Sequence, residues 1–239
     1  MLFKLRMKLF KPGFLKLLIL CISILMCQSC FEIIEELNLN EDGSGTFCFT
    51  INMSQSKLNI NSLFLLDSIN GRPMPKKENM NEAVDKIEKA LKENIDIGNV
   101  LAKKNWDEYI FSVSGSFTNI EALNMAIVKI NTLFNQQGKY EADIHDNYSY
   151  TNKVFTRLYN YNLVNEYNSM PEKDKTVFNN AKYTSIYRFS MEVASYSNPE
   201  AKKSKSGKAI MLKVDVKDLI TNNKTIKNSI DYICELRIK

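Results

Sequence analysis

The cysteine at position 30 is the residue with the most specific chemistry in this sequence. It follows the small residue Ser29 at the exit of an apolar segment, Leu17–Met26, and no acid occurs before Glu32. That segment is well short of the ~20 residues that a membrane-spanning helix needs. A basic segment, an apolar segment and a small-residue exit are the parts of a secretory signal. Five flanking cations argue against a buried core helix: Lys4, Arg6, Lys8, Lys11 and Lys16.

This exit resembles a bacterial lipoprotein signal, in which a cysteine after small residues is lipidated and becomes the first residue of the mature chain. Cys21 and Cys27 compete for that role, but each follows a large apolar side chain. Cys27 also occupies the position where the pattern has an aliphatic residue. The sequence therefore predicts a signal peptide over residues 1–29 and lipidation of Cys30, with residues 30–239 tethered to a membrane through that lipid.

Two further cysteines, Cys48 and Cys234, remain in the mature chain. An exported protein can join such a pair in a disulfide, provided that the Cα atoms come within ~7 Å and the side chains face each other. The alternation over Thr46–Met53 places Cys48 on the polar face of a strand. Cys234 instead shares an apolar face with Tyr232 and Leu236. Two reduced thiols are expected, and one disulfide is the alternative.

The residues that usually carry catalysis are sparse. His145 is the single histidine, which excludes His-pair zinc sites and relays that need a second histidine. Its neighbours Asp143 and Asp146 favour a solvated strand end over a metal site. Glu35 and Glu36 point to opposite faces of a strand, which does not suit paired acid–base work. No GxSxG, P-loop or GxGxxG motif occurs. No catalytic residue, cofactor or metal ion is expected, and a carboxylate-based hydrolase is the alternative.

Net charge does not indicate a nucleic-acid partner. The formal charge is +5, but five of the 32 Lys+Arg residues precede Cys30. The other 27 balance 27 Asp+Glu residues, so the mature part is close to neutral. Electrostatic binding of a polyanion needs a basic patch, so no nucleic acid is expected among the partners.

Two weaker patterns concern binding. Aromatic residues between positions 106 and 167 can line a sugar- or lipid-binding surface, although half-buried sheet packing explains most of them. Lysines over residues 202–208 form a cationic loop. We interpret this loop as a solvated hairpin tip rather than as a binding site for a lipid headgroup or an anionic glycan. The residues concerned are Trp106, Tyr148, Tyr150, Tyr159, Tyr161 and Tyr167, and Lys202, Lys203, Lys205 and Lys208.

Alternation and helical spacing predict the first half of the fold. The turn residues Asp42 and Gly43 join two strands into a β-hairpin. Apolar residues recur at helical spacing over Asn81–Asn94, and Tyr109–Phe117 alternates as the clearest strand. The remaining elements expected here are hairpin strands at Ile33–Leu39 and Thr46–Met53, a short helix within Ser54–Asn70 and a strand at Gly98–Lys104.

Capping signals organise the second half. Thr118 and Glu121 form a capping box at the start of an expected helix. Ser169 and Glu172 form a second one, before a shorter helix. The helices should extend to Phe134 and Phe178, with two strands within Tyr140–Tyr161, further strands at Tyr183–Val193, Ala209–Val216 and Ile230–Ile238, and a helical turn at Asp218–Asn223.

Antiparallel hairpins separated by amphipathic helices predict an α+β fold, with one mainly antiparallel sheet and helices packed on one face. No linker divides residues 30–239, so a single domain is expected. The DGSG hairpin directly after Cys30, the Tyr-rich strand Tyr183–Val193 and the closing strand from Lys208 resemble uncharacterised Bacteroidetes-type lipoproteins and, more distantly, the LppM-like envelope domain. The latter resemblance implies an α+β fold likened to lipid carriers and a glycolipid association, without a catalytic signature.

The sequence thus predicts a lipid-anchored protein of the bacterial cell envelope, in the outer membrane, that acts as a non-enzymatic interaction or structural module. The helix stripes and the Tyr109–Phe117 strand face are sufficient to fill a core between them. A carrier of lipid or glycolipid, with a cavity between sheet and helices, is the alternative. The expected partners are the membrane and an envelope protein or lipid.

Overall fold

The structure is a computed structural model that describes residues 31–64, 68–69, 72–73, 76–134, 146–158, 163–221 and 226–232. Several predictions concern residues outside these ranges: the signal peptide, Cys30, His145 and Cys234. Among the described helices, none is both long enough and apolar enough to cross a membrane.

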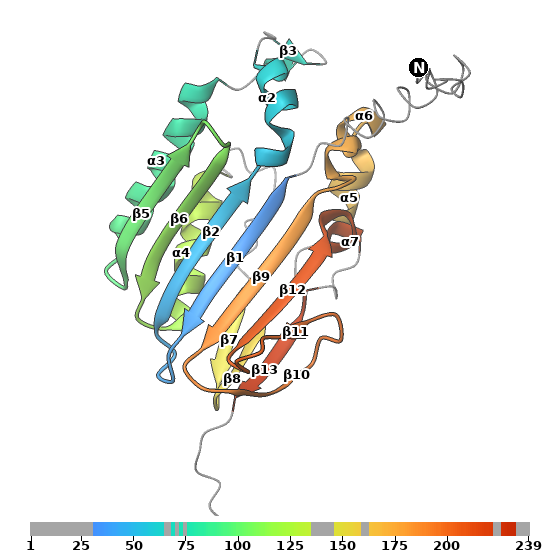
Figure 1. The fold of residues 1–239 in the computed structure, drawn as a ribbon. Helices are drawn as coiled ribbons and strands as arrows, with labels where there is room; N and C mark the ends of the chain where they lie inside the picture. Colours follow the sequence, from blue (N-terminus) through green and yellow to red (C-terminus); the bar gives the residue numbers. More distant parts are fainter. Residues whose placement is uncertain are drawn as a thin grey trace, which may run out of the picture.

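A seven-stranded sheet forms the frame of the fold (Figure 1). Its strands are β1 (Glu32–Leu39), β2 (Gly45–Asn52), β5 (Ile97–Asn105), β6 (Ile110–Phe117), β9 (Lys182–Phe189), β11 (Lys202–Lys203) and β12 (Ala209–Asp215). Their spatial order is β11-β12-β9-β1-β2-β6-β5. β1 and β9 run parallel, and every other neighbouring pair is antiparallel. The predicted α+β class with a mainly antiparallel sheet is confirmed.

The first hairpin forms as predicted, because its turn chemistry is local. Gly43 adopts a φ of +83°, a backbone conformation that residues with a Cβ atom rarely adopt. The Asp42 carboxylate accepts hydrogen bonds from the backbone N–H of Ser44 at 2.9 Å and from its hydroxyl at 2.6 Å. These bonds hold the pKa of Asp42 below its usual value.

Two helices lie on one face of the large sheet, over its β5 and β6 side (Figure 1). They are α3 (Lys77–Lys92) and α4 (Ile120–Phe134). α3 begins before the predicted Asn81, since the Asn79 side chain accepts the Lys76 backbone N–H at 3.1 Å and closes a capping box one turn earlier.

The cap of α4 differs from the predicted one. The Asn119 side chain accepts the backbone N–H of Ala122 at 2.8 Å, so Asn119 fills the N-cap role and the Thr118–Glu121 capping box is wrong. The Thr118 hydroxyl lies 3.3 Å from Asp96 instead. Asn and Thr are both good N-caps, and the two residues are adjacent, so sequence alone did not separate them.

A second, four-stranded sheet covers the rest of the same face. Its strands, in spatial order, are β10 (Val193–Tyr196), β13 (Asn228–Tyr232), β8 (Val154–Arg157) and β7 (Tyr148–Thr151). β7 and β8 are joined by Asn152 and Lys153, with φ values of 53° and 63°. Two successive positive φ angles are what a two-residue hairpin turn requires, so the expected pair of strands is confirmed.

One expected strand is divided between the two sheets. Tyr183–Val193 was predicted as a single strand, but β9 ends at Phe189 and β10 begins at Val193. The Ser190 N–H still bonds to Leu39 of the large sheet at 3.3 Å, whereas the Val193 N–H bonds to Gly207 at 2.9 Å. The chain changes layer within these residues, so β10 joins a second sheet that the sequence did not predict.

Short helices gather at the end of the large sheet where β1 begins (Figure 1). The second predicted capping box is wrong: Ser169 ends one helix, and the next begins after Pro171 without a side-chain cap. The remaining elements are η1 (Ser54–Ser56), α2 (Lys57–Leu63), β3 (Ser68–Ile69), β4 (Arg72–Pro73), α5 (Val164–Ser169), α6 (Glu172–Lys175), η2 (Thr176–Phe178) and α7 (Val216–Thr221).

The core lies between the large sheet and its two covers. Leu37, Phe47, Phe117, Leu123 and Phe155 come from β1, β2, β6, α4 and β8, and all are buried in one cluster. We call the side of the large sheet that faces this core the inner face and the other side the open face. Figure 1 shows both covering layers on the inner side.

Candidate functional site

β1 contributes an acid to each face of the large sheet, as the alternation predicted. Glu35 shares the inner face with Leu37 and Leu39 and is buried, whereas Glu36 is half-buried on the open face. A buried carboxylate needs a partner, since an unpaired charge inside a protein is strongly unfavourable. The two acids therefore define two candidate sites, one inside the fold and one on its surface.

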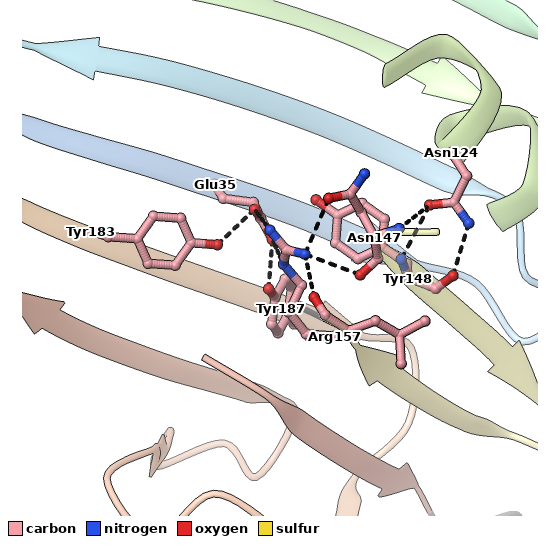
Figure 2. A network of polar contacts seen from close by, with 8 residues as sticks. Glu35, Asn124, Asn147, Tyr148, Arg157, Tyr183 and Tyr187 are labelled. Atoms are coloured by element: carbon pink, nitrogen blue, oxygen red, sulfur yellow. Dashed lines mark hydrogen bonds and ion pairs between the residues drawn. The ribbon is translucent and has the colours of Figure 1, made fainter. Parts of the chain in front are cut away.

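The inner site is a carboxylate held by a guanidinium and two phenols (Figure 2). Arg157 Nη2 donates to Glu35 Oε2 at 3.1 Å. Its Nε lies 3.1 Å from Oε1, an ion-pair contact in which the N–H is not aligned on the oxygen. The hydroxyls of Tyr183 and Tyr187 donate to Oε2 and Oε1 at 2.6 and 2.5 Å.

Arg157 also connects this site to the start of β7. Its Nη1 donates to the carbonyl oxygens of Asn147 at 3.1 Å and Leu158 at 2.5 Å. The guanidinium carbon lies 4.9 Å from the centre of the Tyr148 ring, a cation–π distance. The Asn124 side chain of α4 extends the network, because it accepts the Asn147 and Tyr148 N–H groups at 3.0 and 3.1 Å (Figure 2).

Burial and the charge of Glu35 set the ionisation of its neighbours. Burial raises the pKa of Tyr148, Tyr183 and Tyr187 well above the ordinary value, and the negative charge of Glu35 raises it further. Burial alone would lower the pKa of Arg157, but the charge of Glu35 and the electrostatic effect of the three tyrosines together outweigh burial, and that pKa rises. The phenols therefore stay neutral and the guanidinium stays charged at physiological pH.

The inner site is closed to solvent. The side chains of Glu35 and Arg157 are 7% and 8% exposed, and Tyr148 and Tyr187 are 1% exposed. Both carboxylate oxygens already accept a phenol and face the guanidinium. The arrangement joins β1 and β9 of the large sheet to β8 of the small sheet, and it acts as a polar cross-link inside the core.

The open face carries a different chemistry. Serine and threonine side chains occupy outward positions of β2 and β6, where Thr46 pairs with Ser116 and Cys48 with Ser114. Arg188 donates to Glu36 at 3.0 Å across β9 and β1. This surface combines hydroxyls with paired charges.

The charge pairs continue to the end of the sheet where β1 begins. Lys213 donates to Glu32 at 2.8 Å, Thr184 donates to the same carboxylate oxygen at 2.5 Å, and Lys182 donates to Asp215 at 2.5 Å. Partial burial would raise the pKa of Glu32, but the hydrogen bonds from Lys213 and Thr184, together with the charge of Lys213, lower that pKa.

A shallow hollow of about 360 Å³ lies on the open face near the β1–β2 turn. Polar side chains from β1, β2, β5, β6 and β9 line it: Glu36, Asn38, Thr46, Asn99, Ser116 and Arg188. Asn99 stands at a β-bulge of the edge strand with a φ of 51°, and its side chain donates to Ser116 at 3.3 Å. Hydrogen-bond donors and acceptors therefore converge on one open concavity.

Among the predicted binding residues, most are structural. Cys48 is a free thiol on the open face, as expected. Trp106 packs on Phe111 with ring centres 4.8 Å apart. Tyr148 and Tyr167 are buried, so they do not line a surface, and Tyr159 and Tyr161 lie outside the described residues.

The lysine loop is likewise tied to the fold. Lys203 donates to the Val193 carbonyl at 2.9 Å, and Lys208 donates to the Ser190 carbonyl at 2.9 Å. In the described ranges, His, Cys, Asp and Glu side chains do not gather into any group of three that would hold a metal ion.

The comparisons with known proteins give one distant neighbour. No protein-family model and no curated protein matches this chain. The structure is similar to the NMR structure of the folded domain of Mycobacterium tuberculosis LppM, with a TM-score of 0.38 and 10% sequence identity. The match covers 87% of this chain and 94% of that domain. It is a distant resemblance to that domain, and it does not support a Bacteroidetes origin.

Sequence analysis did not identify Arg157 or the tyrosines at 183 and 187 as members of one site. One signal was present, because alternation placed Glu35 among apolar residues and thus implied a buried partner. The partner lies in another sheet and far along the chain, so no local pattern connects Arg157 to Glu35.

Proposed function

We propose that this chain is a lipoprotein of the bacterial cell envelope that binds a protein partner without catalysing a reaction. In this proposal Cys30 carries the lipid, in the outer membrane, and the open face of the large sheet, centred on the hollow beside Glu36 and Arg188, receives the partner. The observation that carries the proposal is that the described helices and the small sheet cover one side of the large sheet, while a concavity bordered by Glu36, Thr46 and Arg188 lies on its other side.

The anchor is supported by the sequence before the domain. A cationic segment and an apolar segment lead to Ser29 and Cys30, and β1 begins at Glu32, directly after the proposed lipidation site. One lipid chain anchors a protein marginally, and two or more anchor it stably. A processed lipoprotein of this kind would stay in the membrane fraction.

The composition of the open face favours a protein partner over a glycan. Sugar sites commonly use aromatic side chains as contact platforms, because these supply large apolar area with a polar edge. The outward positions of β1, β2, β6, β9 and β12 carry hydroxyl, amide, aliphatic, sulfur-containing and charged side chains, and the aromatic residues of these described strands occupy inward positions. Backbone and polar side-chain groups of a protein fit such donors and acceptors.

The carrier alternative requires a ligand cavity between the sheet and its covers, typically ~300–1,000 Å³ and mainly apolar. The hollow beside Glu36 lies on the open face. A second hollow of about 330 Å³ lies by Phe31, Lys182 and Lys213, at the end of that face. Both hollows are open at the surface, where a partner can reach them.

The anchor is tested by mass and fractionation. Full-length protein expressed in a Gram-negative host should yield a mature N-terminus at Cys30 with added acyl mass, in the membrane fraction. Cys30→Ala should leave unprocessed or soluble protein, while Cys27→Ala should be processed normally. An unlipidated mature N-terminus at another residue would contradict the proposal.

The binding surface is tested by site-specific photo-crosslinking in the native cell. A photoreactive amino acid at Ser114, on the open face, should give one discrete protein adduct. The matched control is Lys86, an exposed residue of α3 on the covered side, where no such adduct is expected. Equal adducts at the two positions, or none at Ser114, would overturn the open face as the binding surface.

A further inference from the structure

Exposed apolar side chains gather at the end of the domain where β1 begins. Leu58 of α2 is 80% exposed, Val177 of η2 is 41% exposed, and Leu163, directly before α5, is 40% exposed. Figure 1 shows α2, α5 and α6 together at that end of the large sheet. Contact with water is unfavourable for such side chains, so an apolar environment at this end of the domain would stabilise them.

The same end holds the first described residue of the chain. The Phe31 carbonyl accepts the Lys182 backbone N–H at 2.9 Å, and the Phe31 ring lies edge-on to Phe178 with centres 6.4 Å apart. Phe31 is therefore fixed to β9 and η2. Because consecutive Cα atoms are ~3.8 Å apart, a lipid on the residue that precedes Phe31 would be attached to this end of the fold without an intervening linker.

Four lysines of this end are paired with acids. Lys57 lies 3.1 Å from Glu108, and Lys175 lies 2.7 Å from Glu172. Lys182 and Lys213 are paired with Asp215 and Glu32 in the same way. Attraction to anionic lipid needs unpaired basic groups, so these four paired lysines contribute little to recognition of a charged headgroup.

We infer that this end of the domain rests on the lipid bilayer, with Leu58, Leu163 and Val177 in the boundary between headgroups and acyl chains. The inference rests on lipidation of Cys30. The large sheet then stands away from the membrane, with the β1–β2 turn farthest from it, and the open face is exposed to the side for a partner. Burial of apolar side chains in that boundary strengthens membrane binding beyond what the lipid anchor supplies.

The contact is tested with the full, processed protein in vesicles whose phospholipids carry brominated acyl chains, which quench a tryptophan that touches them. Trp106 is the single tryptophan, so Trp106→Phe provides a silent background. Leu58→Trp and Val177→Trp probe the proposed contact. Ile95→Trp is the matched control, since Ile95 is 96% exposed and precedes β5 at the opposite end of the sheet.

Quenching at positions 58 and 177 should exceed that at position 95 at least threefold. Exchange of neutral phosphatidylcholine for anionic phosphatidylglycerol should change it less than twofold. Lipidated protein with equal, weak quenching at all three positions would overturn the membrane contact and leave the anchor intact. An intact mass without lipid would overturn the anchor, and this inference with it. Circular dichroism of each variant reports that the fold is retained.

Discussion

The strand β1 contributes the acid of two Glu–Arg pairs, one on each face of the large sheet. Glu35 and Arg157 are 7% and 8% exposed, between the two sheets. Glu36 and Arg188 are 29% and 46% exposed, on the open face. The same two chemical groups are therefore paired in two environments, the protein interior and the solvated surface. The two glutamates are neighbours on one strand.

The difference between the pairs lies in what surrounds them. The buried carboxylate also accepts hydrogen bonds from two phenols, and the buried guanidinium also donates to two carbonyls. Removal of one member of the buried pair leaves the other charge buried, with neither its partner nor water to stabilise it. The surface pair keeps water on both sides, so either member tolerates loss of its partner. The inner pair supports the fold, and the outer pair is available for recognition.

Replacement of Arg157 should have the largest effect on stability. Arg157→Met leaves Glu35 buried and uncompensated, and loss of one partner of a buried ion pair typically lowers the free energy of unfolding by ~3–5 kcal/mol. Urea unfolding of the domain measures this value. A loss below ~1 kcal/mol would show that the carboxylate finds water or another donor, and the proposed cross-link would be wrong.

Loss of one phenol should have a smaller effect. Tyr187→Phe removes the hydroxyl that donates to Glu35 Oε1 at 2.5 Å and keeps the ring that packs on Phe155. A hydrogen bond to a charged group contributes ~1.5–3 kcal/mol, and the urea midpoint should fall accordingly. Tyr196→Phe is the control, because Tyr196 is 37% exposed and should leave the midpoint unchanged. Equal midpoints for both variants would contradict the assigned bond.

Alkaline pH should weaken the inner site progressively. The pKa values of Tyr148, Tyr183 and Tyr187 are raised in the folded state, whereas an unfolded tyrosine titrates near 10. Above that pH the folded protein holds more protons than the unfolded one. Stability is therefore retained below pH ~10 and falls above it, by up to ~1.4 kcal/mol per pH unit for each tyrosine.

The measurement combines circular dichroism with ultraviolet absorbance of phenolate. These three tyrosines should ionise together with loss of structure. Their ionisation while the dichroism stays native would show that the site is open to solvent.

Replacement of Arg188 should have the smallest effect. Arg188→Met breaks the pair with Glu36, but exposed ion pairs contribute ~0–1 kcal/mol and are screened by salt. Urea unfolding of this variant beside Arg157→Met compares the two pairs directly. A loss as large as that of the buried variant would mean that the open face is covered in solution.

Sequence patterns predicted those parts of the fold that depend on neighbouring residues. The hairpin around Gly43, the stripe of α4 and the alternation of Tyr109–Phe117 were confirmed, because turn chemistry and periodicity are local. The strands β7 and β8 were expected, but their assembly with β13 and β10 into a second sheet was not, because these pairings join segments far apart in the sequence.

The inner site was predictable only in half. Alternation placed Glu35 toward the core, and burial of an acid requires a counter-charge. Arg157 is separated from it by 122 positions, and its selection depends on how the two sheets stack. The hollow on the open face was equally inaccessible, since it exists only where five strands lie side by side.

The parallel pairing of β1 with β9 has a consequence for how the chain folds. β1 lies in the interior of the sheet, yet one of its neighbours is synthesised about 150 positions later, as Glu32 pairs with Lys182. Contacts so distant in sequence form slowly, because a long loop must close first. The strand β1 therefore lacks one of its two neighbouring strands until the chain has been synthesised through β9. The export proposed above would benefit from this order, since the first half of the chain cannot complete the sheet before β9 has followed it.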